Sequence, residues 1–340
     1  SPYIGRLSDS FGRKTFIIIG ILFWMIPRII LIFYINFFLY WTLGILSDIN
    51  GGDQILPALK ASISDIVSPK DRVNAFGKMH GSLGVGLIIG AMFAIGVSSV
   101  WDNYTVLLAM AIWYIILFVF STFFIHETID INDNRVPINR NVWKNPFRPL
   151  SVICHNKFLM LMSLISFFGS LVEAGIMSSL FGYVGYSLQL NDDAEASMVF
   201  GIYVTITSLV LVPVSVFFLP WLKRKKLHYS NIITIAVCFR IVSLLLLALI
   251  SFDLNGYGQY ILYMSGVLHG AGLFNFAVLE GVVSEYVAKD CSGIAFGVVT
   301  SYKGIAGILG PFSFGILFTE LSDTNYSYLF IMLGIFMCVI

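Results

Sequence analysis

The hydrophobic positions of the chain fall into long runs separated by short polar segments. A helix that crosses a bilayer needs about 20 mostly apolar residues, and nine complete runs reach that length. They lie at about 15–36, 38–62, 77–100, 104–125, 157–186, 198–221, 230–252, 258–283 and 293–318, and a tenth begins near 326. Strands of a membrane barrel are only about ten residues long and alternate in polarity. The runs therefore predict membrane-spanning helices.

The composition points to the same class of protein. Of the 340 residues, 58% are hydrophobic and 11% are charged, whereas soluble domains carry roughly 25% charged residues. The net charge of +1 gives no reason to expect binding to nucleic acid. The four cysteines form no C-x-x-C pair, and the sequence shows no nucleotide-binding loop, nucleophile triad or metal signature. We expect an integral multi-pass membrane protein that is not an enzyme and has no cofactor or metal.

The charges of the loops predict how the chain is oriented. Lys and Arg residues of the loops all fall on the side that holds loop 5–14, while the opposite loops carry Asp and Glu instead. By the positive-inside rule, loop 5–14 and the hydrophilic segment 127–156 are cytoplasmic. We expect an N-terminal helical bundle over 1–126, a cytoplasmic linker over 127–156 and a C-terminal helical bundle over 157–340.

An internal repeat relates the two halves at a shift of 220 residues, from Ser64 and from Ser284. The matched positions include three glycines in each copy, and small residues let helices approach closely. The expected interface glycines are Gly77, Gly84 and Gly90 in the first copy and Gly297, Gly304 and Gly310 in the second. Transporters can be built from such parallel repeats. A static packing seam and a rocking interface both fit the pattern, and chance similarity of glycine-rich helices is the remaining alternative.

A motif in the first loop resembles a known signature. Residues 5–14 read Gly-Arg-Leu-Ser-Asp-Ser-Phe-Gly-Arg-Lys, which is similar to the G-x-L-x-D-x-x-G-R-[KR] signature of the major facilitator superfamily. Residues 63–66, 173–175 and 310–311 resemble its tetracycline-antiporter and hippocampus-abundant-transcript-like branch. The resemblance implies an all-α fold of two pseudo-symmetric six-helix bundles. It also implies that this chain lacks the first helix, most of the second and the end of the twelfth.

The resemblance implies a cytoplasmic gate around this loop. Its expected residues are Gly5, Asp9, Gly12, Arg13, Lys14 and Arg72. Gly5 and Gly12 permit tight backbone turns. We predict that Asp9 pairs with Arg72 and with the positive N-terminus of the helix that begins near residues 292–293. These contacts would latch the cytoplasmic side in one state.

Ionisable groups within the apolar runs are functional candidates by default. Arg28 and Asp48 both lie about 20 Å above the inner face on sequential helices, so we expect them to form a buried structural pair. Lys60 and Glu280 lie near helix ends, from which their side chains could reach the interface. For Arg240 we expect pairing inside the protein.

In the family fold the first, fourth, seventh and tenth helices line the cavity. This implies a substrate and ion pathway whose candidates are Asp53, Glu173, His269, Asn275 and Asp48. A buried carboxylate at Asp53 or Glu173 could bind a cation or carry a proton. His269 fits either a packing hydrogen bond or a proton relay.

We predict a secondary active transporter that moves a small organic solute by alternating access, with protons as the candidate coupling ion. The fifth helix lacks the Gly-Pro of the antiporter motif, so an uncoupled facilitator is one alternative. The other is a transporter-like receptor or scaffold that acts through residues 126–156. The expected partners are the small-molecule substrate, protons and the lipid bilayer, without nucleic acid, and the chain is expected to be a monomer.

Overall fold

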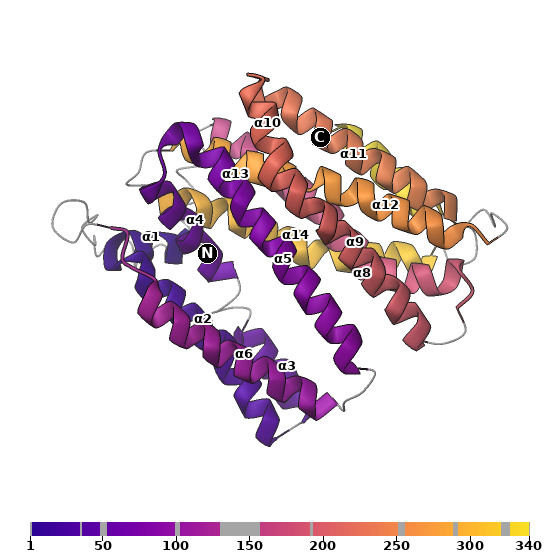
Figure 1. The fold of residues 1–340 in the computed structure, drawn as a ribbon, viewed down its shortest axis with the longest axis horizontal. Helices are drawn as coiled ribbons and strands as arrows, with labels where there is room; N and C mark the ends of the chain where they lie inside the picture. The colour runs from indigo at the N-terminus through magenta and orange to yellow at the C-terminus, as the bar shows by residue number, and fades with distance from the viewer. Residues whose placement is uncertain are drawn as a thin grey trace. The chain divides into compact units, whose positions relative to one another are not determined.

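The computed structural model of the protein describes residues 2–34, 36–47, 53–98, 103–129, 157–190, 193–250, 256–287, 292–320 and 327–339. Within these ranges every regular element is a helix (Figure 1). Eight of the helical stretches in the described residues are long and apolar enough to cross a membrane. The prediction of an all-helical polytopic fold is therefore confirmed.

Contacts within the chain gather it into two compact units. The first unit consists of Ser1–Arg72, Gly96–Ser163 and Val283–Gly304, and the second of Val73–Ile95, Leu164–Val282 and Ile305–Ile340. Each unit thus combines segments that lie far apart in the sequence. The predicted bundles over 1–126 and 157–340, joined by a linker over 127–156, stay a prediction.

The first unit is built around helix α2. Its helices are α1 (Pro2–Phe11), α2 (Arg13–Phe33), α3 (Phe37–Ser47), α4 (Asp53–Ile66) and α6 (Asn103–Phe124). Helix α2 packs against α1, α3, α4 and α6, and α2 and α6 run side by side in Figure 1. The core between α2 and α4 consists of Ile17, Ile21, Ile55 and Ala58. The run predicted at 38–62 contains both α3 and α4, and residues 48–52 lie outside the described residues.

Apart from η2 (Pro69–Asp71), which lies in the first unit, the remaining helices contribute mainly to the second unit. They are α5 (Arg72–Ser98), α8 (Lys157–Ser187), α9 (Asp193–Pro213), η4 (Val214–Phe218), α10 (Leu219–Arg224), α11 (Tyr229–Leu249), α12 (Gly258–Gly272), α13 (Asn275–Tyr286), α14 (Ser292–Glu320) and α15 (Ser327–Val339). Helix α12 packs against α9 and α11, and α11 packs against α15.

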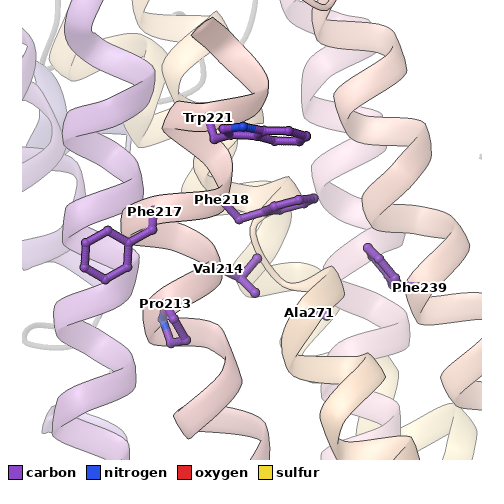
Figure 2. A pocket seen from close by; sticks show the side chains of 7 residues that line it. All are labelled: Pro213, Val214, Phe217, Phe218, Trp221, Phe239 and Ala271. Carbon is purple, nitrogen blue, oxygen red and sulfur yellow. The ribbon is translucent and has the colours of Figure 1, made fainter. Parts of the chain in front are cut away.

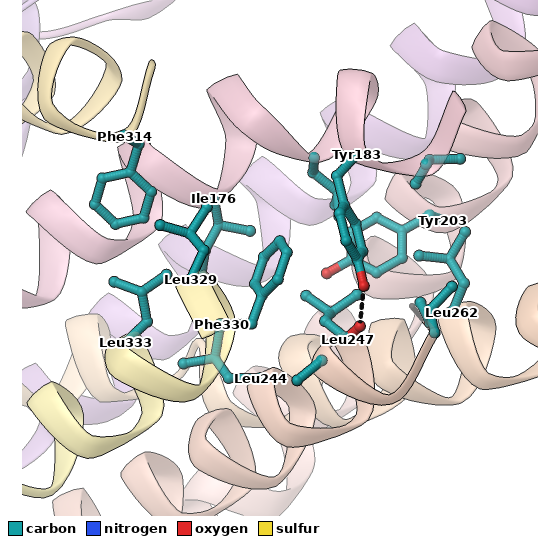
Figure 3. Close-up of a cluster of buried hydrophobic side chains, with 14 of the residues drawn as sticks. Ile176, Tyr183, Tyr203, Leu244, Leu247, Leu262, Phe314, Leu329, Phe330 and Leu333 are labelled. Atoms are coloured by element: carbon teal, nitrogen blue, oxygen red, sulfur yellow. Dashed lines mark hydrogen bonds between the residues drawn. The ribbon is translucent and has the colours of Figure 1, made fainter. Parts of the chain in front are cut away.

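A large apolar cluster holds the second unit together. Figure 3 shows aromatic and aliphatic side chains that interdigitate around Tyr183, whose hydroxyl donates a hydrogen bond to the carbonyl of Leu247. The rings of Tyr183 and Phe330 lie 4.6 Å apart between centroids. This bond satisfies the buried hydroxyl, so the aromatic ring can be buried without leaving a polar group unpaired.

The predicted helix over 258–283 is interrupted. Helix α12 ends at Gly272, a short turn follows at residues 273–274, and α13 begins at Asn275. The break follows a close helix contact, since a Cβ at Gly270 would overlap the backbone of Thr207 on α9. Interrupted helices within a membrane protein occur where the freed backbone is buried in protein or lines a cavity.

Candidate functional site

An ionic cluster joins three helices inside the second unit. Glu173 lies on α8, and its Oε2 is 2.7 Å from Nη2 of Arg240 on α11. Its Oε1 is 3.1 Å from Nε2 of His269 on α12. The side chains of Arg240 and His269 are each 1% exposed, whereas Glu173 is 24% exposed. The Glu173 side chain is therefore the most exposed of the three.

Small residues around Arg240 let the three helices approach. The backbone carbonyl of Gly169 on α8 lies 3.5 Å from Nη2 of Arg240. A Cβ at Gly272 would overlap the Arg240 side chain. The guanidinium also lies 5.5 Å from the ring centroid of Phe276, a cation–π distance. The sequence thus builds a narrow pocket for one buried cation.

The cluster has more donors than the carboxylate can satisfy. Among the described residues, Nε and Nη1 of Arg240 and Nδ1 of His269 are buried without a hydrogen-bond partner. Buried polar atoms are normally paired, so each unpaired atom calls for an explanation. The two guanidinium nitrogens suit a guest that brings acceptor atoms or negative charge, whereas Nδ1 of His269 accepts a hydrogen bond when Nε2 carries the only ring proton.

The structure brings together some of the predicted pathway residues. Glu173 and His269 are in contact, and the pairing of Arg240 inside the protein is confirmed. Asn275 begins α13, where it is buried and its Oδ1 has no hydrogen-bond partner among the described residues. Asp53 begins α4 in the first unit. For Asp53, the structure describes the helix position but not the side chain.

Asp48 lies outside the described residues, so its predicted pair with Arg28 stays a prediction. Arg28 itself donates a hydrogen bond to the carbonyl of Trp24 at 3.1 Å. Its guanidinium lies 5.3 Å from the ring centroid of Tyr114.

A second polar cluster surrounds the motif of residues 5–14 in the first unit. Arg13 forms ion pairs with Asp9 on α1 and, at 3.2 Å, with Asp65 on α4. Asp9 also accepts a hydrogen bond of 3.3 Å from the backbone N–H of Gly293, at the start of α14. The predicted contact between Asp9 and that helix N-terminus is confirmed. Burial raises the pKa of Asp9 to about 6, although Arg13 counteracts part of this effect.

The predicted pair of Asp9 with Arg72 is wrong. Arg72 donates instead to the backbone carbonyls of Ser64, Val67 and Ser284. These carbonyls lie at or just beyond the C-terminal ends of α4 and α13, where cations are favoured by the helix dipole. Arg13 lies four residues after Asp9, across the turn at Gly12, and its guanidinium is the ion-pair partner of the carboxylate.

The two motif glycines have different roles. Gly12 has φ 108°, so the predicted tight turn is confirmed there. Gly5 lies within α1 rather than in a turn, and a Cβ at this position would overlap the carbonyl group of Gly293. Its function is therefore close approach to α14. The expectation of a turn at Gly5 is wrong.

Glu127 was missed by the sequence reasoning. Its carboxylate accepts hydrogen bonds from the backbone N–H groups of Arg13 at 2.8 Å and Lys14 at 3.2 Å. It therefore caps the first turn of α2, because Gly12 has no side chain with which to do so. No local pattern links positions 114 residues apart.

Three of the repeat glycines lie at close helix contacts. A Cβ at Gly77 or Gly84 on α5 would come within 3.0 Å of atoms in η4 or α9, and one at Gly310 on α14 within 3.0 Å of α8. Gly90 faces open space, with no described atom within 4 Å of its Cβ position, so the contact expected there is wrong. Gly297 is buried and Gly304 is half-buried within the first unit.

The expectation that the side chains of Lys60 and Glu280 reach the membrane–water interface is wrong, because both are buried. Glu280 on α13 is 1% exposed and Lys60 on α4 is 3% exposed. Glu280 Oε2 lies 3.1 Å from Nε2 of His80 on α5. Glu280 is buried although it lies near a helix end, because α13 is buried on nearly every face.

An all-helical chain with several membrane-length helices belongs to the class of multi-pass membrane proteins. The Major Facilitator Superfamily model matches residues 1–311, and the chain belongs to this superfamily. The predicted family resemblance is confirmed.

Individual proteins show the same relationship. The chain is 22% identical over 323 residues to Hippocampus abundant transcript-like protein 1 of Homo sapiens. The match covers 94% of this chain and 60% of that protein. It is 24% identical over 326 residues to Tetracycline resistance protein, class H, of Pasteurella multocida, covering 94% and 76% of the two chains. The crystal structure of the human organic anion transporter MFSD10 (TETRAN) matches with a TM-score of 0.73 and 17% identity, covering 99% of this chain and 79% of that one.

Proposed function

We propose that the protein is a proton-coupled secondary transporter that moves a small organic solute by alternating access. The observation that carries the proposal is the cluster of Glu173, Arg240 and His269. Ionisable groups at membrane depth cost about 2.5–3.5 kcal/mol each on insertion scales. A membrane protein that places three such groups in one cluster, joined through Glu173, must offset this cost, and binding of a solute or a proton is a function that accounts for it.

Protonation of Glu173 would change what the cluster can bind. The ionised carboxylate neutralises Arg240 at 2.7 Å, and the neutral acid leaves that positive charge without a counter-ion. A solute with an anionic or hydrogen-bond-accepting group would then replace the carboxylate as partner of Arg240 and His269. Binding of the proton and of the solute would thus be coupled. The proton neutralises the Glu173 carboxylate, and the solute then supplies the partner that Arg240 has lost.

The partial exposure of Glu173 supports this role for the carboxylate. A proton donor or acceptor must be reachable, and Glu173 is far more exposed than its two partners. The names of two similar proteins, an organic anion transporter and a tetracycline resistance protein, support a small organic solute as cargo.

The first experiment identifies a ligand for the purified full-length protein. Organic acids, sugars, amines and drugs are screened for thermal stabilisation between pH 5 and pH 8. A ligand at 100 times its dissociation constant adds about 2.7 kcal/mol of stability. We expect hits among acidic solutes, stronger at low pH and lost in Arg240→Met.

Transport is then measured in proteoliposomes with the identified solute. We expect uptake that is accelerated by an imposed pH gradient. If the uptake rate did not depend on the pH gradient, the protein would be an uncoupled facilitator and not a proton-coupled transporter. Specific binding without any flux would favour the receptor or scaffold alternative.

A further inference from the structure

An apolar groove of about 510 Å³ opens on the second unit. It is lined by Val214 and Phe218 of η4, Trp221 of α10, Phe239 of α11 and Ala271 of α12. Figure 2 shows the rings of Phe218 and Trp221 lying one above the other and facing the side of Phe239. The lining is almost wholly apolar, so the groove suits a hydrocarbon guest.

The local helix geometry shapes this groove. Residues Val214–Phe218 form a π-helical turn between α9 and α10. A π turn widens the helix, and such turns often mark functional positions. The ring planes of Phe218 and Trp221 are 19° apart with centroids separated by 5.7 Å. Trp221 is half exposed, as is usual for Trp side chains at the membrane–water interface.

A basic turn follows the groove directly. Lys223, Arg224, Lys225 and Lys226 come immediately after the α10 residues that line it. Nζ of Lys225 lies 5.6 Å from the ring centroid of Trp221, so the positive charge stands at the mouth of the groove. No Asp or Glu occurs in the sequence between residues 195 and 253. The turn is therefore strongly cationic.

We propose that this groove and turn form a binding site for an anionic phospholipid. One acyl chain would lie along the apolar groove, and the phosphate and headgroup would contact the basic turn. The apolar groove lies next to the positively charged turn, just as the acyl chain of a phospholipid lies next to its charged headgroup. The turn also lies on the side that the sequence predicts to be cytoplasmic, and anionic lipids are concentrated in the cytoplasmic leaflet. The site is independent of the proposed transport function.

Tryptophan quenching tests the site in reconstituted full-length protein. Bilayers contain brominated phosphatidylglycerol in one sample and brominated phosphatidylcholine of the same chain length in another. The Trp221 signal is the difference between wild type and Trp221→Phe. We expect stronger quenching by the anionic lipid at equal mole fraction, and a smaller preference when the salt concentration is raised.

Two variants separate the headgroup and acyl contributions. Neutralising the turn with Lys223→Gln, Arg224→Gln, Lys225→Gln and Lys226→Gln should abolish the anionic preference but not quenching itself. Ala271→Phe should fill the groove and reduce quenching by both lipids. The matched controls are Lys70→Gln with Lys78→Gln, which removes exposed charge elsewhere, and Ile308→Phe, which adds bulk to an exposed position on α14.

Equal quenching of wild type by the two lipids would overturn the proposal and identify ordinary boundary lipid. A preference unchanged by the charge variants, or by high salt, would also overturn it. Native mass spectrometry gives an independent reading, since the site predicts one retained phosphatidylglycerol per chain. A dimer without retained lipid would assign the groove to a second copy of the chain instead.

Discussion

Glu173 and Arg240 lie 67 residues apart in sequence and are joined by a 2.7 Å contact between Oε2 and Nη2. The pair is asymmetric, because the Arg240 side chain is 1% exposed and the Glu173 side chain is 24% exposed. His269 completes the arrangement on the second carboxylate oxygen. The buried positive charge of Arg240 therefore depends on Glu173 as its counter-ion.

Removing the buried cation should destabilise the protein. Arg240→Met leaves the Glu173 carboxylate without its main partner, and breaking a buried ion pair costs roughly 3–5 kcal/mol. The midpoint of thermal unfolding should fall by several degrees. Arg224→Met, at an exposed position, is the control and should leave the midpoint unchanged.

The double variant Glu173→Gln with Arg240→Met distinguishes charge from packing. Because it removes both charges, it should recover most of the stability lost by Arg240→Met alone. A double variant no more stable than the single one would show that packing around Arg240, and not its charge, determines the loss.

The cluster around Asp9 should respond to pH. Since burial raises the pKa of Asp9 from 3.8 to about 6, the buried arrangement binds a proton that a solvated Asp9 releases in this range. Lowering the pH from 7 to 5 should therefore favour the buried arrangement, and raising it should open the cluster. A cysteine at Ser292, with native cysteines replaced, should lose more reactivity between pH 7 and pH 5 than a reference cysteine at the exposed position Lys70, whose rate reports the thiolate fraction alone.

Asp9→Asn should remove this response. The neutral side chain resembles protonated Asp9, so the ratio of reactivity at position 292 to that at the reference position should be low and independent of pH. The shift toward the buried arrangement of the Asp9 cluster should occur without unfolding, so the amount of folded protein on gel filtration should not change. If the variant kept the pH dependence of the wild type, Asp9 would not be the group that controls the latch.

Two glycines on α5 should behave in opposite ways when replaced by alanine. A Cβ at Gly77 would lie 2.7 Å from a backbone carbonyl oxygen in η4, whereas Gly90 meets nothing within 4 Å. We expect Gly77→Ala to lower the unfolding midpoint. Gly90→Ala should raise stability by about 0.5–1 kcal/mol through helix propensity. Equal effects of the two substitutions would contradict the described contact of α5 with η4.

The hydrophobic runs were sufficient to predict the fold class, because a bilayer imposes length and polarity on each helix. The turn at Gly12 and the contact of Asp9 with residue 293 also follow from a motif of fixed spacing. Which faces of the helices meet could not be predicted. Helices that are apolar on every side give no amphipathic pattern to orient them, so the partners of Glu173 and Glu280 and the cap supplied by Glu127 were visible only in three dimensions.

The most direct test of the central claim is solute-driven proton movement through Glu173. Full-length protein is reconstituted with a pH-sensitive dye inside the vesicles, and the solute identified by the stability screen is added outside. We predict a solute-dependent pH change in wild type and in the exposed control Glu195→Gln. In Glu173→Gln the pH change should be lost while solute binding persists. Wild-type proton movement in Glu173→Gln would contradict the account.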